Sequence, residues 1–344
     1  MTIFILSAAV FITSWLGTDI FRRFGLRKSL LDVPNERSSH TAPVPRGGGV
    51  VIVFLSLLVY AAVCITYPNS ISAGYVIGSL LVASISAADD LFSLPFFVRL
   101  SVHCLAAALV VFDVGSFGGL HLPAAGPEIS FGSAGAVVTF FWLVWMINAY
   151  NFMDGIDGIA GIQAAVASAG WAAIAYFAGA HGLVLFCASV GASALGFLVQ
   201  NWSPARIFMG DVGSAFLGFT FGSIPLMIGR ETTYPSGWLF ATAIFILWPF
   251  LFDTVYTLAR RITRRETLWE AHRSHLYQRL VISGYSHTAV SLLYGTFAIC
   301  ITVLASAALI GAGIYEYLVI SLAILISAGL LGAVSLTEKV DLNP

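Results

Sequence analysis

The feature of this sequence that most constrains its fold is a series of apolar runs long enough to cross a membrane. A helix needs roughly 20 predominantly apolar residues to span about 30 Å of hydrocarbon. Only 10% of the 344 residues are charged, against about a quarter in soluble domains. We therefore predict an all-α polytopic integral membrane protein with about 11 transmembrane helices. The runs cover about residues 2–18, 46–66, 73–88, 98–112, 136–148, 160–177, 182–199, 213–229, 236–258, 286–311 and 314–335.

The runs leave no separate soluble domain, so residues 1–344 are predicted to form a single transmembrane domain. No charge precedes the first run and no clean cleavage site follows it, which favours a retained helix over a signal peptide. The sequence shows no nucleic-acid motif, and no nucleic-acid partner is expected.

Lys and Arg predict how the chain is oriented, because basic residues concentrate in cytoplasmic loops. Counting run boundaries generously, all 16 Lys and Arg residues except Arg230 fall on one side of the predicted membrane. We therefore predict that this side is cytoplasmic, with the N-terminus outside and the C-terminus inside. Its segments are 19–45, 89–97, 149–159, 200–212, 259–285 and the tail after 335. Contacts with anionic lipids would explain part of this bias equally well.

Carboxylates gather on the same side. Asp89, Asp90, Asp154, Asp157 and Asp211 all fall at predicted cytoplasmic helix ends, within a few residues of the hydrocarbon. Charge placed in hydrocarbon costs free energy, although less near helix ends. Five acids at one level therefore indicate a functional site.

Two of these acids, Asp89 and Asp90, end the third run in SAADDLFSLPFFVRL, and Arg99 begins the next run. Adjacent carboxylates repel each other, so a cation is expected nearby. A solvated acid pair with Arg99 as its partner is the simpler alternative.

The stretch NAYNFMDGIDG places Asn148, Asn151 and Asp154 three residues apart, so that they share one helical face. Its two glycines favour an unwound turn that brings Asp157 back toward them. Carboxylate and amide oxygens are the hard ligands that Mg²⁺ or Mn²⁺ prefers. An Asp–Gly turn at a helix end is the alternative.

Three other loops carry candidate site residues. Asp211 in FMGDVGS is a candidate metal ligand or a helix N-cap. His272, Arg273 and His275 in EAHRSHLYQRL suit phosphate oxygens, whereas a zinc site would lack a third soft ligand. Arg46 and the three glycines after it resemble an anion-binding loop, with a flexible connection as the alternative.

Hard-metal ligands and phosphate-binding cations at one cytoplasmic interface indicate phosphoryl transfer. One reactant would come from the cytosol and the other from the lipid, which explains why acids follow apolar runs. The main alternative is a secondary transporter with a cytoplasm-facing acidic ion site, although transporter acids usually lie near mid-bilayer. Asp253 comes closest to such a position. A scaffolding membrane protein would leave the motifs unexplained.

The chain resembles the polyprenyl-phosphate N-acetylhexosamine-1-phosphate transferases, of the glycosyltransferase family 4 type, and most of all their bacterial O-antigen-initiating branch. The resemblance covers nearly all of the chain. It rests on four motifs in order: DD at 89–90 followed by Arg99, NAYNFMDGIDG at 148–158, FMGDVGS at 208–214 and HRSH at 272–275.

The resemblance implies roles for the matching residues. Asn151 and Asp211 would hold Mg²⁺, or Mn²⁺, near the pyrophosphate. The catalytic candidates are Asp89 and Asp90, which match an essential acid pair, and Asp154 and Asp157, which match acids around the nucleotide-sugar pocket. The substrate-binding candidates are Arg99, His272, Arg273 and His275 from the resemblance, with Arg46 and Asn148 added from the loop and helix face described above.

The implied activity is transfer of N-acetylhexosamine 1-phosphate from a UDP-sugar to undecaprenyl phosphate, with release of UMP. The sugar would be GlcNAc or a 6-deoxy form such as FucNAc or QuiNAc, because HRSH has one histidine fewer than the H-x-H-H form of the muramyl-pentapeptide relative. The product would initiate O-antigen or other lipopolysaccharide synthesis at the bacterial inner membrane. The loops at 19–45, 89–97, 149–159, 200–212 and 259–285 would form the active site on the cytoplasmic face, and a homodimer is left open.

Overall fold

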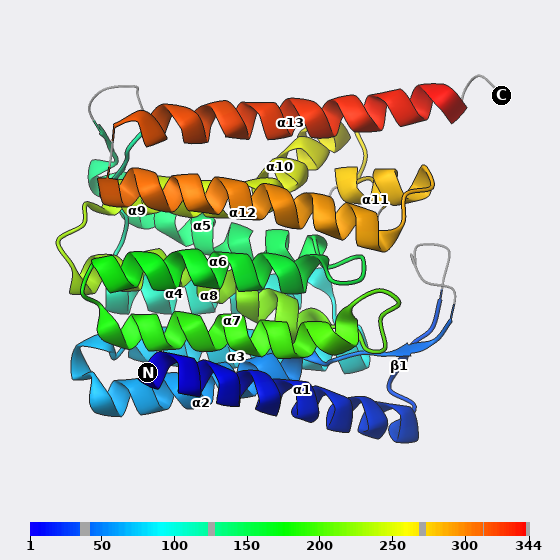
Figure 1. The fold of residues 1–344 in the computed structure, drawn as a ribbon, viewed down its shortest axis with the longest axis horizontal. Helices are drawn as coiled ribbons and strands as arrows, with labels where there is room; N and C mark the ends of the chain where they lie inside the picture. Colours follow the sequence, from blue (N-terminus) through cyan, green and yellow to red (C-terminus); the bar gives the residue numbers. More distant parts are fainter. Residues whose placement is uncertain (35–41, 123–127, 268–272, 312, 342–344) are drawn as a thin grey trace.

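The computed structural model describes residues 1–34, 42–122, 128–267, 273–311 and 313–341, with side chains as far as residue 336. Over these residues the chain is a bundle of helices with two short pairs of strands (Figure 1). The helices are α1 (Thr2–Lys28), α2 (Gly49–Thr66), α3 (Ala73–Phe92), α4 (Phe96–Val114), α5 (Gly135–Phe152), α6 (Ile159–Phe177), α7 (His181–Asn201), α8 (Asp211–Glu231), α9 (Ser236–Ile246), α10 (Trp248–Thr263), α11 (Leu276–Ile282), α12 (His287–Gly311) and α13 (Ile314–Asp341).

The strand pairs are small and antiparallel. β1 (Leu31–Asp32) pairs with β2 (Val44–Pro45), and β3 (Gly119–Leu120) pairs with β4 (Ile129–Ser130). Two single turns of 3₁₀ helix, η1 (Pro68–Ser70) and η2 (Gly132–Ala134), precede α3 and α5.

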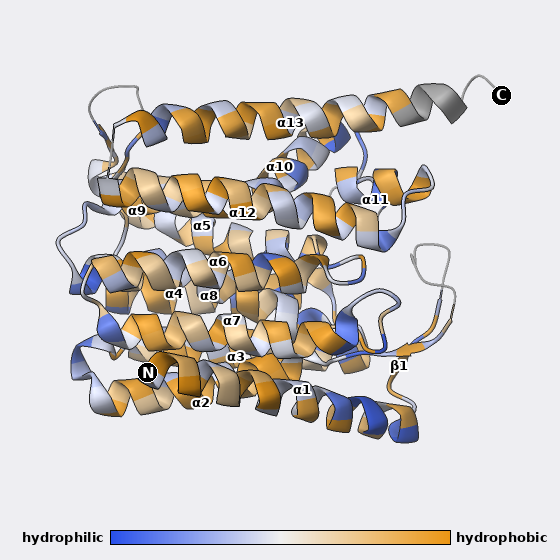
Figure 2. Cartoon of the chain, viewed as in Figure 1, coloured by the Kyte–Doolittle hydropathy of each residue, from blue (hydrophilic) through white to orange (hydrophobic). Residues whose placement is uncertain are grey.

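Ten of the described helices are long and apolar enough to cross a membrane, and α9 with α10 make an eleventh, broken span. The prediction of an all-α polytopic membrane protein with about 11 spans is confirmed. Figure 2 shows apolar residues along the lengths of the helices and hydrophilic residues at their ends, many of them at the end that carries α11. The start of α1 and the end of α13 lie at opposite ends of the bundle (Figure 1), as an odd number of spans requires. Which end faces the cytoplasm stays a prediction.

The ninth predicted run, 236–258, is not one straight helix. It breaks at Leu247, and α10 leaves α9 at an angle of 77°. Pro249 lies in the first turn of α10, where its missing N–H removes no intrahelical hydrogen bond. The break was not expected because both halves of the run are made mostly of apolar residues, which can continue in one helix.

Helix α8 forms the centre of the bundle and packs against α5, α3, α2 and α9. Its contact with α5 is close because Gly218 has no side chain: a Cβ there would lie 2.3 Å from the carbonyl oxygen of Met146. The α5 end that carries Asn151 therefore lies beside the start of α8, which carries Asp211. This packing brings two of the sequence motifs together.

Candidate active site

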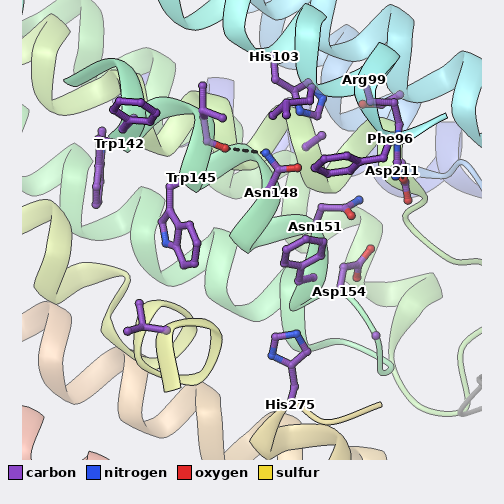
Figure 3. Close-up of a pocket in the computed structure, with 18 of the residues that line it drawn as sticks. Phe96, Arg99, His103, Trp142, Trp145, Asn148, Asn151, Asp154, Asp211 and His275 are labelled. Atoms are coloured by element: carbon purple, nitrogen blue, oxygen red, sulfur yellow. Dashed lines mark hydrogen bonds and ion pairs between the residues drawn. The ribbon is translucent and has the colours of Figure 1, made fainter. Parts of the chain in front are cut away.

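A cavity of about 940 Å³ lies where α3, α4, α5, α8 and α11 meet. One part of its wall is polar and includes Arg99, Asp154 and Asp211 (Figure 3). The other part is apolar and aromatic, and its residues are Val138, Phe141, Trp142, Val144, Trp145, Phe240 and Val255. Phe141 is 63% exposed, so the apolar part reaches the outer surface of the bundle.

Six of the twelve predicted site residues line this cavity: Arg99, Asn148, Asn151, Asp154, Asp211 and His275. Five others are not among the residues that line it: Asp89, Asp90, Asp157, Arg46 and Arg273. His272 lies outside the described residues.

The Asp90 carboxylate connects α3 to the start of α8. It accepts the backbone N–H of Asp211 at 3.1 Å and that of Val212 at 3.2 Å, which are unpaired donors of the first turn of α8. Asp211 is therefore the first residue of α8. The alternative interpretation, in which Asp211 is the N-cap, is wrong because Gly210 occupies that position. A negative charge at this position is also stabilised by the helix dipole. Asp90 thus fixes where α8 begins.

Asp89 binds Arg99 instead of facing the cavity. Its Oδ2 lies 2.5 Å from Nη1 of Arg99, and its Oδ1 accepts the backbone N–H of Leu94 at 2.6 Å. The same Nη1 lies 3.2 Å from Oδ2 of Asp211. The arginine that was expected near the acid pair therefore bridges Asp89 to Asp211, with its guanidinium at the cavity wall.

Arg46 contacts the other acid of the pair. It donates to the backbone carbonyl of Asp90, and its Nε lies 3.9 Å from that carboxylate. Two of the three glycines after it, Gly48 and Gly49, use their N–H groups within the chain. Gly48 donates to the carbonyl of Phe208 and Gly49 to that of Met209, so this loop packs against the segment that leads into α8.

The end of α5 supplies the amides and Asp154. The side-chain N–H₂ of Asn151 donates to Ser214 on α8 at 3.0 Å, and its amide also contacts Asp211. Asn148 donates its N–H₂ to its own helix, at the carbonyl of Val144. The chain then unwinds as predicted, and Gly155 makes room for a ring of α11: a Cβ there would lie 2.0 Å from the hydroxyl of Tyr277.

Asp154 has an unusual electrostatic environment. Burial raises the pKa of its carboxyl group well above the usual value, and the negative charges of Asp211, Asp90 and Asp157 raise it further. Several carboxylates in one partly enclosed space are stable as anions only if a cation compensates them. The site therefore has more negative charge than Arg99 neutralises.

Asp157 lies apart from this group. Burial raises the pKa of its carboxyl, but the hydrogen bond and charge of His287, with the N–H of Ala205, outweigh burial and hold the pKa below its usual value. Its Oδ1 lies 3.3 Å from Nδ1 of His287, and its Oδ2 accepts the Ala205 N–H at 3.1 Å. The structure thus places Asp157 in a network that joins the α5–α6 and α7–α8 connections to the first residue of α12, and its catalytic role stays a prediction.

His275 is held by Asp253, a residue that the motifs did not include. Its Nδ1 donates to Oδ1 of Asp253 at 3.0 Å, and its ring lines the cavity (Figure 3). Asp253 is fully buried and accepts further hydrogen bonds from Leu276, Tyr277, Thr257 and Tyr294. The sequence signal for Asp253 was its position as a lone acid in an apolar run. Only the fold shows that it binds His275. Arg273 is half-buried just before α11 and does not line the cavity.

The residues around Asp211 fit a hard divalent cation. Within the described chain, no three His, Cys, Asp or Glu side chains form a metal-binding group. Mg²⁺, however, is usually bound by one or two protein oxygens, with water and substrate phosphates completing its shell. Asp211 and the adjacent amide of Asn151 provide such a pair, and the excess negative charge around Asp154 favours a cation.

Residues 72–229 match the family model of glycosyl transferase family 4. A probable undecaprenyl-phosphate N-acetylglucosaminyl 1-phosphate transferase of Bacillus subtilis is 29% identical, over 86% of this chain and 83% of its own length. Over residues 72–229 the chain is therefore similar to glycosyl transferase family 4. A second relative, the undecaprenyl-phosphate alpha-N-acetylglucosaminyl 1-phosphate transferase of Escherichia coli K12, is 28% identical over 81% of this chain and 76% of its own.

A third relative matches a shorter part. The phospho-N-acetylmuramoyl-pentapeptide-transferase of Staphylococcus saprophyticus is 31% identical over 54% of this chain and 56% of its own. The family that the four motifs predicted is thereby confirmed.

Proposed function

We propose that the protein transfers N-acetylhexosamine 1-phosphate from a UDP-sugar to undecaprenyl phosphate, releasing UMP. The observation that carries the proposal is a single cavity with a carboxylate and arginine wall at one part and an aromatic, apolar wall at the other. Such a cavity suits one reactant with a diphosphate and a second with a hydrocarbon chain. The names of the relatives above support the same acceptor.

In the proposed reaction an oxygen of the lipid phosphate attacks the β-phosphorus of the UDP-sugar. A new P–O bond forms, the bond from that phosphorus to the oxygen bridging it to the α-phosphorus breaks, and UMP leaves with the electron pair. Arg99, already aligned by Asp89 and Asp211, would bind phosphate oxygens. A magnesium ion held by Asp211 and Asn151 would neutralise charge on the diphosphate.

Asp89 is proposed to position Arg99 and not to act as a general base. A phosphate monoester has a second pKa of about 6, so at neutral pH the acceptor is already largely a dianion. The contacts of both Asp89 oxygens, to Arg99 and to the Leu94 N–H, support a positioning role. In Asp89→Asn the rate should fall by a similar factor at every pH, whereas recovery of most activity at high pH would indicate a base.

The function is tested by incubating the detergent-solubilised chain with polyprenyl phosphate, a UDP-sugar and Mg²⁺. We expect UMP release that requires both substrates and stops when EDTA removes the divalent cation. A panel of UDP-GlcNAc, UDP-FucNAc and UDP-QuiNAc would identify the sugar. No UMP with any UDP-N-acetylhexosamine would contradict the proposal and favour the transporter.

The proposed setting is the bacterial inner membrane, with the cavity open to the cytoplasm. There the lipid-diphospho-sugar would start an O-antigen or related cell-surface polysaccharide. This assignment is supported by the basic residues at the cavity end of the bundle. Deleting the encoding gene should remove that polysaccharide, and restoration by Asp211→Asn would contradict the assigned role.

A further inference from the structure

His103 on α4 is a buried residue whose polar atoms have no partner in the folded chain. Its side chain is only 6% exposed, and neither Nδ1 nor Nε2 makes a hydrogen bond within the described residues. Burying a polar group without a hydrogen bond costs free energy, so such groups are usually satisfied by water or by a ligand. His103 is among the residues that line the cavity described above.

The position of His103 separates the two parts of the cavity. It lies one helical turn beyond Arg99 on α4, so both side chains are on the same helical face. Figure 3 shows His103 and Asn148 between the aromatic side chains of Trp142 and Trp145 and the polar group formed by Arg99 and Asp211. Asn148 uses one N–H of its side-chain amide to donate to the Val144 carbonyl of its own helix.

The chemistry of the ligand follows from this placement. Imidazole carries at least one N–H donor in either protonation state, so His103 requires an acceptor. The next residues in one direction are hydrocarbon and aromatic, and in the other direction a guanidinium. A ligand that satisfies all three has an anionic oxygen attached directly to a long hydrocarbon chain.

We propose that His103 binds the phosphate of the polyprenyl phosphate, donating an imidazole N–H to an oxygen that does not attack. This inference rests on the proposed function and deepens it, because it assigns the acceptor site. His103 fixes how deeply the phosphate enters and selects phosphate-headed lipids over the free alcohol. Arg99 binds a second oxygen of the same phosphate.

The test compares His103→Leu, which removes the donor, with His103→Gln, which retains one. Binding of polyprenyl phosphate and of polyprenol to the purified full chain is measured by native mass spectrometry in detergent. We expect His103→Leu to weaken phosphate-lipid binding by about tenfold or more, as loss of a hydrogen bond to a charged group predicts, and to leave polyprenol binding unchanged. His103→Gln should stay within about threefold of the parent.

Kinetics provide a second readout. In His103→Leu the KM for polyprenyl phosphate should rise by a similar factor, while the KM for the UDP-sugar stays constant. Cys104→Ser, the next position on the same helix, is the matched control and should alter neither value, because Cys104 does not line the cavity. A thermal unfolding curve checks that each variant folds.

Equal loss of phosphate lipid and polyprenol in His103→Leu would overturn the inference, because it would show a packing role. Unchanged phosphate-lipid binding would also overturn the inference, because it would show that the imidazole binds water and not the lipid phosphate. In both cases a parent chain that releases UMP leaves the proposed function standing. A parent chain that neither binds polyprenyl phosphate nor releases UMP removes both.

Discussion

Asp253 shows how much of the candidate site depends on residues that contact no reactant. Its buried carboxylate accepts five hydrogen bonds, from His275 Nδ1, two backbone N–H groups and the hydroxyls of Thr257 and Tyr294. It therefore ties α10, α11 and α12 together directly behind a cavity-lining histidine. A carboxylate that accepts a hydrogen bond from a histidine ring nitrogen in this way sets the tautomer and orientation of the imidazole.

Replacing Asp253 with Asn should lower kcat by about 10- to 100-fold, the usual cost of losing such a supporting carboxylate. Asn has an N–H₂ group in place of one carboxylate oxygen. That group would face hydrogen-bond donors from which the oxygen now accepts. The double variant with His275→Ala should be no slower than His275→Ala alone, since Asp253 is expected to act through that ring. Additive losses in the double variant would show that Asp253 acts through another part of the site.

Asp154 supports a prediction about stability. Its pKa is raised, mainly by burial, so its ionisation opposes folding once the pH exceeds the ordinary Asp value of 3.8, and the penalty grows until the pH passes the folded pKa. In EDTA, Asp154→Asn should therefore raise the unfolding temperature by roughly 2 °C or more at about pH 8, and by less at about pH 5. Added Mg²⁺ should narrow the difference from the parent.

Asp157→Asn is the control of opposite sign. The pKa of Asp157 is lowered, so its charge stabilises the folded chain at every pH above its ordinary value and loses that effect only as the pH falls through the folded pKa. The substitution should lower the unfolding temperature at about pH 8. Stabilisation by both substitutions would contradict the electrostatic explanation.

Residues that belong to motifs could be predicted from the sequence, and isolated ones could not. Asn151 and Asp211 were expected to meet, and their side chains do. Asp253 and His103 each stand alone among apolar residues, where spacing contains no information about a partner. Only the packing of α10 against α12 and of α4 against the cavity shows what they face.

At the scale of helices and loops, the close approach of α2 and α8 determines where Asp211 lies. A Cβ on Gly49 would lie 2.3 Å from the Cα of Gly213, and Gly49 also donates its N–H to the carbonyl of Met209. In the sequence the triple glycine after Arg46 resembles an anion-binding loop, with a flexible connection as the alternative. Its observed role is to let two backbones meet, a property that the amino-acid letters of one loop do not reveal.

Gly213→Ala should therefore destabilise the protein by about 1–3 kcal/mol, the range for overpacking, and reduce activity because the start of α8 must move. Gly329→Ala on α13 is the matched control, since its added methyl group meets nothing within 4 Å. In a helix that substitution should be neutral or slightly stabilising. Unfolding temperatures in one detergent compare the two variants, and equal values would contradict the packing argument.

At the scale of the whole molecule, bilayer thickness made the fold predictable. Each span needs a minimum length of apolar sequence, so the number and order of the spans could be read from the runs. The bend of 77° between α9 and α10 could not, because the length of an apolar run does not show where a helix breaks inside it. The orientation rests on the basic residues alone and needs its own experiment.

Single cysteines in a chain otherwise free of its four native cysteines would test that orientation. Asn69 and Tyr285 are both exposed. The α2–α3 connection, which carries Asn69, and the α11–α12 connection, which carries Tyr285, lie at opposite ends of the bundle (Figure 1). In intact cells an impermeant thiol reagent should modify Asn69→Cys but reach Tyr285→Cys only after the membrane is permeabilised. The reverse pattern would place the cavity's polar part outside the cell.

The apolar part of the cavity reaches the bundle surface at Phe141 and Val255, which are 63% and 53% exposed. A reactant that enters there arrives by diffusion in two dimensions, so its supply depends on its mole fraction among the surrounding lipids. In liposomes of fixed composition, dilution of the suspension should leave the turnover per molecule constant while the soluble reactant is saturating. Adding inert phospholipid to the same bilayer should slow it.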